Sequence, residues 1–233
     1  AKKYFYNNGE QVNDEFCRWL FTQEYFIAIA HNLKGYDGIF VMNYLLNNVP
    51  INSNKIEILN QGAKILSIKY KNVKLVDSVC FLPMTLAEFS PTFNLVEDKK
   101  GFFPHYFNTL DNQFYVGKIP EKHFYGSVHF GVKKKIEFDE WYDLKKDLIF
   151  DFQKEFNEYC ESDVNLLSKG CLAFRKIIID KTNIDPFLNN ATIASLCHTI
   201  YRSLYMEKHS IAIIPEFGYN PYTNSSKKAI LWL

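Results

Sequence analysis

Residues 25–46 read YFIAIAHNLKGYDGIFVMNYLL and combine three patterns, one after another. Tyr25 to Ala30 is a short, continuous apolar run, which predicts a strand that is buried on both faces. His31 to Gly38 is a polar turn that contains glycine, and helical spacing returns from Ile39 to Leu46. Strand, turn and helix in this order predict an α/β fold, in which catalytic side chains gather at the turns that follow strands.

The same reading extends to the rest of the chain. Further strands are predicted at Ile56–Leu59, Ala63–Tyr70 and Val73–Asp77, with short polar breaks between them, and a last one at Ile211–Ile214. Helical spacing is found at Asn13–Phe21, at about Asp151–Ile178 and at Thr192–Tyr205. The segment from Ser90 to Lys135 is irregular, with scattered proline and glycine, and it predicts loops that form an insertion.

The composition is that of an ordinary globular protein. The 233 residues are 47% hydrophobic and 23% charged, with a net charge of +1, which excludes wholesale disorder and the strong positive excess of a dedicated duplex-binding protein. No apolar stretch approaches the roughly 18–20 residues that span a bilayer, so we expect no membrane partner. The chain starts at Ala1 rather than Met, which suggests a piece of a longer protein.

The cysteines and the N-terminal residues bear on the compartment. The five cysteines form no Cys-x-x-Cys pair, so we expect reduced, mostly buried thiols rather than a disulfide framework or a zinc site. The first residues lack the pattern of a signal peptide. Both observations indicate an intracellular protein, and they do not distinguish nucleus, virion and mitochondrion.

The turn after the first strand offers groups for metal-assisted chemistry. It contains Asn32, Tyr36 and Asp37 in the pattern Asn-x-x-x-Tyr-Asp. Asp37 offers a carboxylate to a hard divalent ion, while Asn32 and Tyr36 can hydrogen-bond to a substrate or stack on it. An ordinary turn stabilised by asparagine and glycine has the same local pattern, so this motif alone leaves both interpretations open.

Two further motifs lie downstream. Tyr159 and Asp163 are four residues apart in a predicted helix, which places a phenol and a carboxylate on one face. The phenol could orient a water molecule while the carboxylate holds a metal ion, although a core tyrosine beside a surface aspartate gives the same spacing. Between these motifs, the segment TLAEF begins at Thr85 and Leu86, and Glu88 stands at the capping-box distance from Thr85. A capped helix explains this segment on its own.

Taken in this order, the three motifs resemble the proofreading 3′→5′ exonuclease region of B-type DNA polymerases. The similarity is to the protein-primed branch, which includes small phages, adenoviruses, linear plasmids and Maverick/Polinton elements. The segment AHNLKGYDGIF is similar to the second exonuclease motif, YCESDV to the third, and TLAEF to the single-stranded-DNA-binding motif. Longer segments similar to the Polinton version are KGFFPHYFN, TIASLCHTIYRSLY and IPEFGYNPYTNSSKKAILWL, so the resemblance runs from about Phe16 to Leu233.

The resemblance implies a fold and a division of the chain. It implies an RNase H-like α/β fold, a mixed sheet flanked by helices, with the N-terminal strands missing from this chain. Residues 1–182 would form the exonuclease domain, and residues 183–233 would form a helix and a linker that lead toward an absent polymerase palm. The implied partners are the 3′ end of single-stranded DNA, primer-template DNA and, in the parent protein, a terminal priming protein.

The resemblance also implies roles for individual residues. Two Mg²⁺ or Mn²⁺ ions would be held by four carboxylates, and Asp37 and Asp163 would be two of these catalytic ligands. Tyr159 would orient the attacking water. The frayed 3′ end would be held by Asn32, Tyr36, Thr85 and Leu86, and Lys135 would contact the scissile phosphate, although a solvated lysine run explains Lys135 equally.

The sequence departs from the family pattern in two places. The family's first exonuclease motif is Asp-x-Glu, upstream of the second, and this chain contains no Asp-x-Glu. Asp151-Phe152-Gln153 has glutamine in the last place and lies downstream, so we interpret it as unrelated. We therefore expect a truncated N-terminus, an incomplete ligand set and little or no nuclease activity from the chain alone. No Asp-x-Asp of the polymerase half is present, and Ile200 stands where the other polymerase motif needs aspartate.

Three functions are compatible with these observations. The first is a fragment of a protein-primed, DNA-directed DNA polymerase whose parent replicates and proofreads DNA. The second is a decayed or co-opted single-stranded-DNA-binding module from a transposon polymerase. The third is an RNase H-like nuclease that acts without a polymerase. The sequence leaves open whether the parent is viral, plasmid or transposon.

Overall fold

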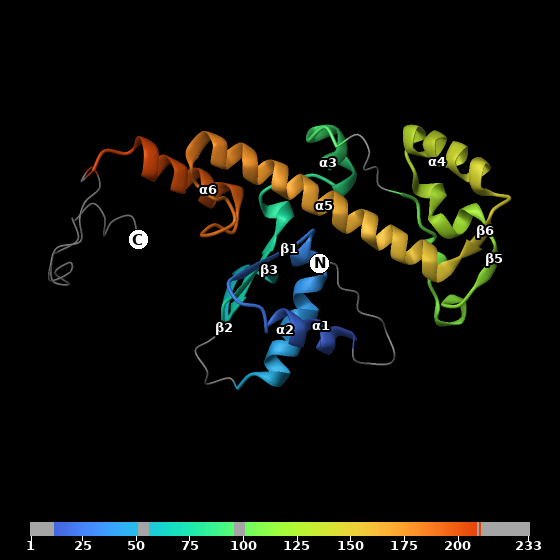
Figure 1. The fold of residues 1–233 in the computed structure, drawn as a ribbon, viewed down its shortest axis with the longest axis horizontal. Coiled ribbons are helices and arrows are strands. Elements are labelled where there is room, and N and C mark those ends of the chain that lie inside the picture. The colour runs from blue at the N-terminus through green and yellow to red at the C-terminus, as the bar shows by residue number, and fades with distance from the viewer. Residues whose placement is uncertain (1–11, 51–55, 96–100, 209, 211–233) are drawn as a thin grey trace, which may run out of the picture.

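The computed structural model describes residues 12–50, 56–95, 101–208 and 210, and the predicted strand at 211–214 lies outside them. A mixed four-stranded sheet has the order β1-β4-β3-β2, with β1 parallel to β4 and the other neighbours antiparallel (Figure 1). The strands are β1 (Phe26–Ala30), β2 (Ile56–Gln61), β3 (Lys64–Tyr70) and β4 (Val73–Asp77). The prediction of an α/β fold with these four strands is confirmed.

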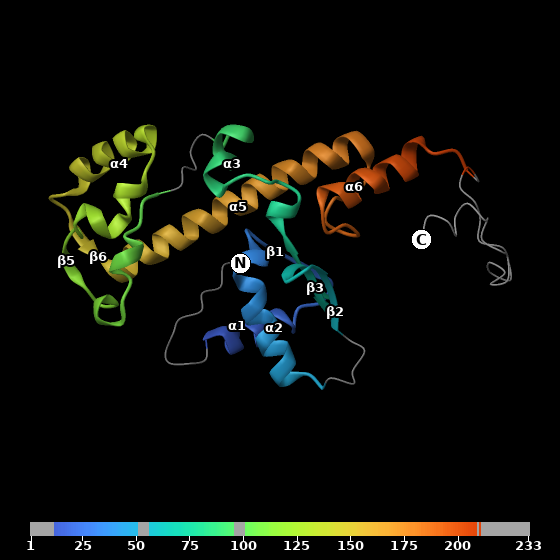
Figure 2. The same cartoon turned by 180° about the vertical axis from the view of Figure 1, so that it is seen from behind.

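Helices cover both faces of the sheet, as the two opposite views show (Figures 1 and 2). On one face, Val73 and Leu75 pack with the helices α1 (Val12–Leu20) and α2 (Asp37–Asn48). On the other face, Val76 packs with α3 (Leu86–Thr92), α5 (Phe152–Thr182) and α6 (Ile193–Ile200). Alternate residues of β4 thus face two separate cores, as the two-residue period of a strand requires.

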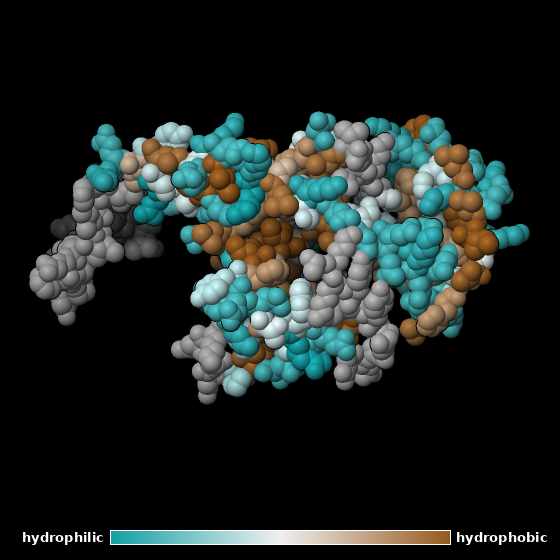
Figure 3. All heavy atoms as spheres, viewed as in Figure 1, coloured by the Kyte–Doolittle hydropathy of each residue, from teal (hydrophilic) through white to brown (hydrophobic). Residues whose placement is uncertain are grey.

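Strand β1 differs from its prediction. Phe26 is exposed and the other residues of the strand are only half-buried, because in the described part of the chain β1 pairs with β4 alone and forms an edge of the sheet. A hollow of about 240 Å³ lies between β1 and α5 and is lined by apolar residues that include Ile27, Ile29 and Leu167. Figure 3 shows apolar side chains gathered in this region, between the sheet and the helices above it.

Residues 101–151 form a separate subdomain at one end of α5 (Figure 1). Most of this segment consists of short turns, as predicted, but it also contains α4 (Val132–Lys145) and a small sheet of β5 (Val116–Lys118) and β6 (Ile149–Asp151). Phe103 and Phe150 of this segment, together with Phe152 of α5, are the buried centre of an aromatic cluster. The segment therefore packs around a core that it shares with the start of α5, which the irregular sequence pattern did not reveal.

The two predicted C-terminal helices are both present. Helix α5 ends at Thr182, and α6 continues into one π-helical turn at Tyr201–Tyr205. Phe187 and Leu196 belong to the same core cluster as residues of α3 and α5. The domain boundary at residue 182 stays a prediction.

Lys74 holds the loop before α6 against the sheet. Its ammonium donates hydrogen bonds to the carbonyls of Phe187, Leu188 and Asn190 at 3.1, 3.1 and 2.7 Å. We expect Lys74→Met to lower the free energy of unfolding by about 2 kcal/mol, because three carbonyls lose a charged donor. Urea unfolding measures this, with Lys69→Met as the control, since Lys69 pairs with Glu57 at the surface. Equal effects in the two variants would contradict the assignment.

The structure bears on two further expectations, the burial of the cysteine thiols and the presence of membrane-spanning helices. All five cysteines are free, but only Cys17 and Cys171 are buried, so the expectation of mostly buried thiols is wrong. Burial raises the pKa of both of these thiols to about 12. In the described residues, no helix has the length and apolar character needed to cross a bilayer.

Candidate functional site

The parallel pairing of β1 and β4 sets the position of the candidate site. Ala30 and Asp77 are partners at the carboxyl ends of these strands, so the turns that follow them lie side by side. Asp77 is fully buried. Its Oδ1 accepts hydrogen bonds from the backbone N–H of Asn32 at 3.0 Å and of Val79 at 2.9 Å, and its Oδ2 accepts one from Lys34 at 3.1 Å. One carboxylate therefore fixes both turns, and this role of Asp77 was not among the sequence-based predictions.

The turn after β1 depends on local backbone chemistry. Asn32 has a φ of 67°, in the left-handed region that asparagine tolerates better than most residues. The backbone then closes over the Asn32 side chain so tightly that a Cβ on Gly35 would lie 2.6 Å from Nδ2 of Asn32. Asp37 follows as the first residue of α2. Partial burial raises the pKa of its carboxyl group, its own backbone N–H opposes this, and the nearby Asp77 adds to the increase.

Two helices bring the other motifs to the same place. Helix α3 starts after Thr85, whose backbone N–H and hydroxyl donate hydrogen bonds to the Glu88 carboxylate at 2.6 and 2.8 Å. This confirms the predicted capping box and leaves Leu86 buried in the first turn of the helix. On α5, Tyr159 and Asp163 are both half-buried, and one carboxylate oxygen of Asp163 is shielded from solvent.

One open cleft of about 950 Å³ collects these residues. Its lining takes in side chains from the turn after β1, the start of α3 and the middle of α5. Of the eight predicted site residues, six line it: Asn32, Asp37, Thr85, Leu86, Tyr159 and Asp163. Three motifs that lie far apart in the sequence thus meet on one surface.

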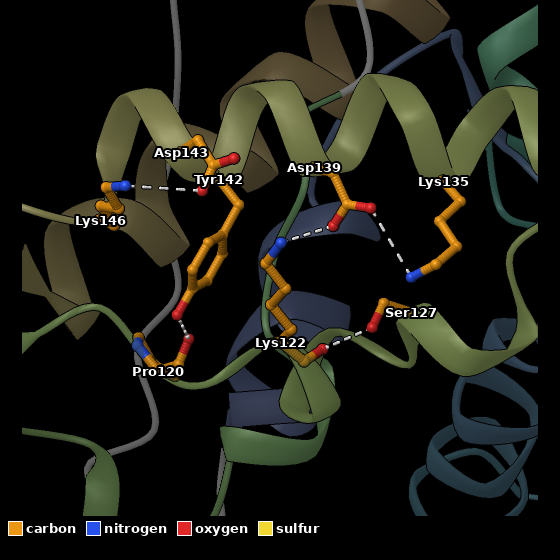
Figure 4. Close-up of polar contacts among 8 residues, drawn as sticks. All are labelled: Pro120, Lys122, Ser127, Lys135, Asp139, Tyr142, Asp143 and Lys146. Atoms are coloured by element: carbon orange, nitrogen blue, oxygen red, sulfur yellow. Dashed lines mark hydrogen bonds and ion pairs between the residues drawn. The ribbon is translucent and has the colours of Figure 1, made fainter.

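Two predicted residues lie elsewhere. Tyr36 is exposed, and its ring packs edge-on against Phe40 with 4.9 Å between the ring centroids. Lys135 lies on α4, where its ammonium is 3.7 Å from the carboxylate of Asp139, which also binds Lys122 at 2.6 Å (Figure 4). The structure therefore does not bring Lys135 to the cleft, and its proposed phosphate contact has no support in this arrangement.

Tyr159 is positioned by aromatic neighbours from the 101–151 subdomain. Its ring stacks on Phe103 with 5.3 Å between centroids and meets His105 edge-on at 5.5 Å. Such aromatic pairs contribute about 0.5–1.5 kcal/mol each beyond their buried area. The segment KGFFPHYFN contains both partners, but the sequence alone gives no signal that they pack on a helix more than fifty residues downstream.

The donor chemistry of the cleft fits a hard divalent ion. Mg²⁺ is often held by one or two carboxylates together with water and substrate phosphates, and Asp37 and Asp163 supply two carboxylates. Glu88 also lines the cleft, but its hydrogen bonds to Thr85 occupy it and lower its pKa. Within the residues that the structure describes, no group of three or more His, Cys, Asp or Glu is placed to hold a metal ion.

Asp151 has a structural role. Its carboxylate accepts a hydrogen bond from the backbone N–H of Lys154 at 3.1 Å, as the N-cap of α5. Substituting such a cap by alanine costs about 1 kcal/mol in helix stability. The resemblance of Asp151-Phe152-Gln153 to a metal-binding motif is therefore explained by helix capping.

Comparison with known proteins gives the family. Residues 17–227 match the family described as DNA polymerase type B, organellar and viral. A probable DNA polymerase of Neurospora intermedia is 31% identical over 190 residues, which cover 78% of this chain and 19% of the relative. A probable DNA polymerase of Ascobolus immersus is 29% identical over 197 residues, covering 78% and 16%, and a DNA polymerase of Kluyveromyces lactis is 28% identical over 188 residues, covering 75% and 18%.

The chain thus spans less than a fifth of the length of each of these three curated relatives. No solved structure matches it. Because the family match takes in nearly the whole sequence, the chain belongs to the organellar and viral family of type B DNA polymerases.

Proposed function

We propose that the chain is the 3′→5′ exonuclease region of a protein-primed, DNA-directed DNA polymerase, and that the cleft holds the 3′ end of a single DNA strand. The observation that carries this proposal is the meeting of Asn32, Asp37, Thr85, Tyr159 and Asp163 in one cleft. A mixed sheet with helices on both faces is compatible with the RNase H-like fold that this function implies.

The residues divide the work by their chemistry. Asp37 and Asp163 would hold Mg²⁺ or Mn²⁺ together with phosphate oxygens, and the bound ion would activate water and neutralise phosphate charge. Tyr159 would orient the attacking water, since Phe103 and His105 fix its ring. The side chains of Asn32 and Thr85 would hydrogen-bond to the terminal nucleotide, and Leu86 gives the base an apolar support.

We extend the proposal to a longer parent protein, to which we assign the remaining activities. A longer polymerase would carry out DNA replication, bind primer-template DNA and use a terminal priming protein. The support is the family match together with relatives that are themselves called DNA polymerases.

A metal-dependence measurement tests the role of the cleft. We expect Mg²⁺ to tighten binding of labelled oligo(dT) to the chain about tenfold relative to EDTA, a gain of about 1.4 kcal/mol. Asp163→Asn is expected to lose this gain, because the amide cannot replace a carboxylate toward a hard cation. Asp180→Asn is the matched control on the same helix, since Asp180 is exposed and pairs with Lys176. Fluorescence anisotropy in both buffers measures all three proteins.

The outcomes separate the candidate functions. An Mg²⁺ gain that Asp163→Asn keeps, or a chain that does not bind oligo(dT) at all, would overturn the proposal. Binding with no Mg²⁺ gain in the unaltered chain would favour a single-stranded-DNA-binding module without metal chemistry. Degradation of the oligonucleotide that Asp163→Asn abolishes would show that a further carboxylate completes the nuclease site.

A further inference from the structure

A second hollow of about 640 Å³ lies beside the cleft, which is within the range of about 300–1,000 Å³ for ligand pockets. We call it the aromatic pocket. Its walls come from the 101–151 subdomain, including the first turns of α4, and from single residues of α3 and α5. Aromatic rings dominate the lining, which includes Phe102, Phe103, Tyr125, Phe130 and Tyr159.

The charges of the aromatic pocket are opposite to those of the cleft. Lys133 and Lys134 line it, together with a single carboxylate, Glu137. The ammonium of Lys134 lies 4.1 Å from the centroid of the Phe130 ring. Neither lysine has an ion-pair partner among the residues that the structure describes. Two such lysines beside the half-buried rings of Phe102, Phe130 and Tyr159 favour an anionic ligand that also has flat aromatic groups.

The aromatic pocket adjoins the cleft. Tyr159 lines both of them, so its ring forms part of their common wall. The first turn of α3 also borders both, because Thr85 and Leu86 line the cleft while Ala87 lines the aromatic pocket. A strand that extended from an end between Asp37 and Asp163 into the aromatic pocket would pass Tyr159 and the start of α3.

We propose that the aromatic pocket binds a nucleotide of the same single strand, on the 5′ side of the end held in the cleft. Its base stacks on the half-buried rings that line the aromatic pocket, and its phosphates contact Lys133 and Lys134. This inference rests on the proposed function and extends it, since it assigns the strand a second anchor in the 101–151 subdomain. The acidic cleft repels phosphate when no metal is bound, so this anchor supplies the metal-independent part of the affinity.

Neighbouring lysines on α4 provide a matched test. In EDTA, we expect the double variant Lys133→Ala/Lys134→Ala to bind oligo(dT) about tenfold more weakly than the unaltered chain. The plot of the logarithm of the binding constant against the logarithm of the salt concentration should become less steep by about 1.4, since each phosphate contact to a single strand contributes about 0.7 to the steepness. Lys135→Ala is expected to leave both quantities unchanged, because Lys135 faces Asp139 instead of the aromatic pocket (Figure 4).

A change in the DNA tests stacking without altering the protein. We expect a single abasic nucleotide, moved stepwise along the oligonucleotide, to weaken binding most at the end and at one internal position. Loss of a stacked base is expected to cost about five- to hundredfold in affinity at that position. The internal sensitivity should remain in Lys135→Ala.

Several results would overturn the second anchor while leaving the proposed function intact. The first is an oligo(dT) affinity that does not change in Lys133→Ala/Lys134→Ala. The second is a loss of affinity in Lys135→Ala that equals the loss in the double variant. The third is an abasic scan in which no internal position weakens binding. Competition by thymidine monophosphate as strong as that by oligo(dT) would also overturn it, since the aromatic pocket would then hold a free nucleotide. Failure of the unaltered chain to bind oligo(dT) in any buffer would instead remove the proposed function itself.

Discussion

Asp77→Ala is expected to lower the free energy of unfolding by about 3–5 kcal/mol, because it removes a buried carboxylate that accepts three backbone hydrogen bonds. The partly buried N–H groups of Asn32, Lys34 and Val79 would lose their acceptor. Domains of this size are stable by about 5–15 kcal/mol, so the change takes a large part of the total. Urea unfolding followed by circular dichroism measures it.

Asp77→Asn should have a smaller effect of the same sign. The amide oxygen can still accept from Asn32 and Val79, as Oδ1 does now, but the amide NH₂ would face the N–H of Lys34. Asp139→Ala is the control, because its carboxylate is only half-buried and pairs with lysines near the surface, where such pairs contribute about 0–1 kcal/mol. An Asp77→Ala protein as stable as the control would show that the two turns are held by other contacts.

Gly170→Ala is the second variant with a large expected effect. A Cβ at this position of α5 would run into the ring of Phe89, which is fully buried in α3. Overpacking of this kind costs about 1–3 kcal/mol, and we expect about 2–3 kcal/mol because the ring is fully buried and also packs edge-on against His31 and Phe93. Binding of oligo(dT) should weaken as well, since α3 carries Thr85 and Leu86 into the cleft. Thermal and urea unfolding, with anisotropy on the folded protein, give both quantities.

Two further variants test whether the loss of stability in Gly170→Ala comes from the clash with Phe89. Gly101→Ala is expected to change stability by less than about 0.5 kcal/mol, because its Cβ would come no closer than 4.0 Å to Tyr159. Gly170→Ala/Phe89→Leu should be more stable than the sum of the two single effects, since the smaller side chain makes room for the new methyl group. Strict additivity would mean that the ring and the glycine do not restrict each other.

Local sequence patterns were sufficient to predict most of the elements that build the sheet. The apolar run before His31, the breaks between the later strands and the three/four spacing of α5 each depend on neighbours along the chain, and each was confirmed. Helix α4 was missed because Phe138 is its only buried residue among those described, so its sequence shows no apolar stripe. Burial of β1 was overestimated, since an apolar run does not say how many neighbouring strands cover it.

The candidate site was predictable to the extent that its residues lie in short motifs. The motifs named Asp37, Tyr159 and Asp163, and the structure brings the three together. Asp77 was not found, because it reads as the last residue of a strand and its partners are backbone groups up to 45 positions away. The phase of α4 decides that Lys133 and Lys134 line the aromatic pocket while Lys135 does not, and a run of three lysines carries no information about that phase.

Because α5 is long, the rotation of each residue about its axis sets how distant parts of the molecule are oriented relative to one another. Its 31 residues extend about 46 Å, from the aromatic cluster at β6 to the loop before α6. One residue gained inside the helix between 152 and 159 would rotate the subdomain about 100° around the axis relative to Asp163. Residues gained in the turns between 101 and 131 would bring no such rotation. Insertions and deletions are therefore expected to be tolerated in the turns between 101 and 131 and to be disruptive within α5.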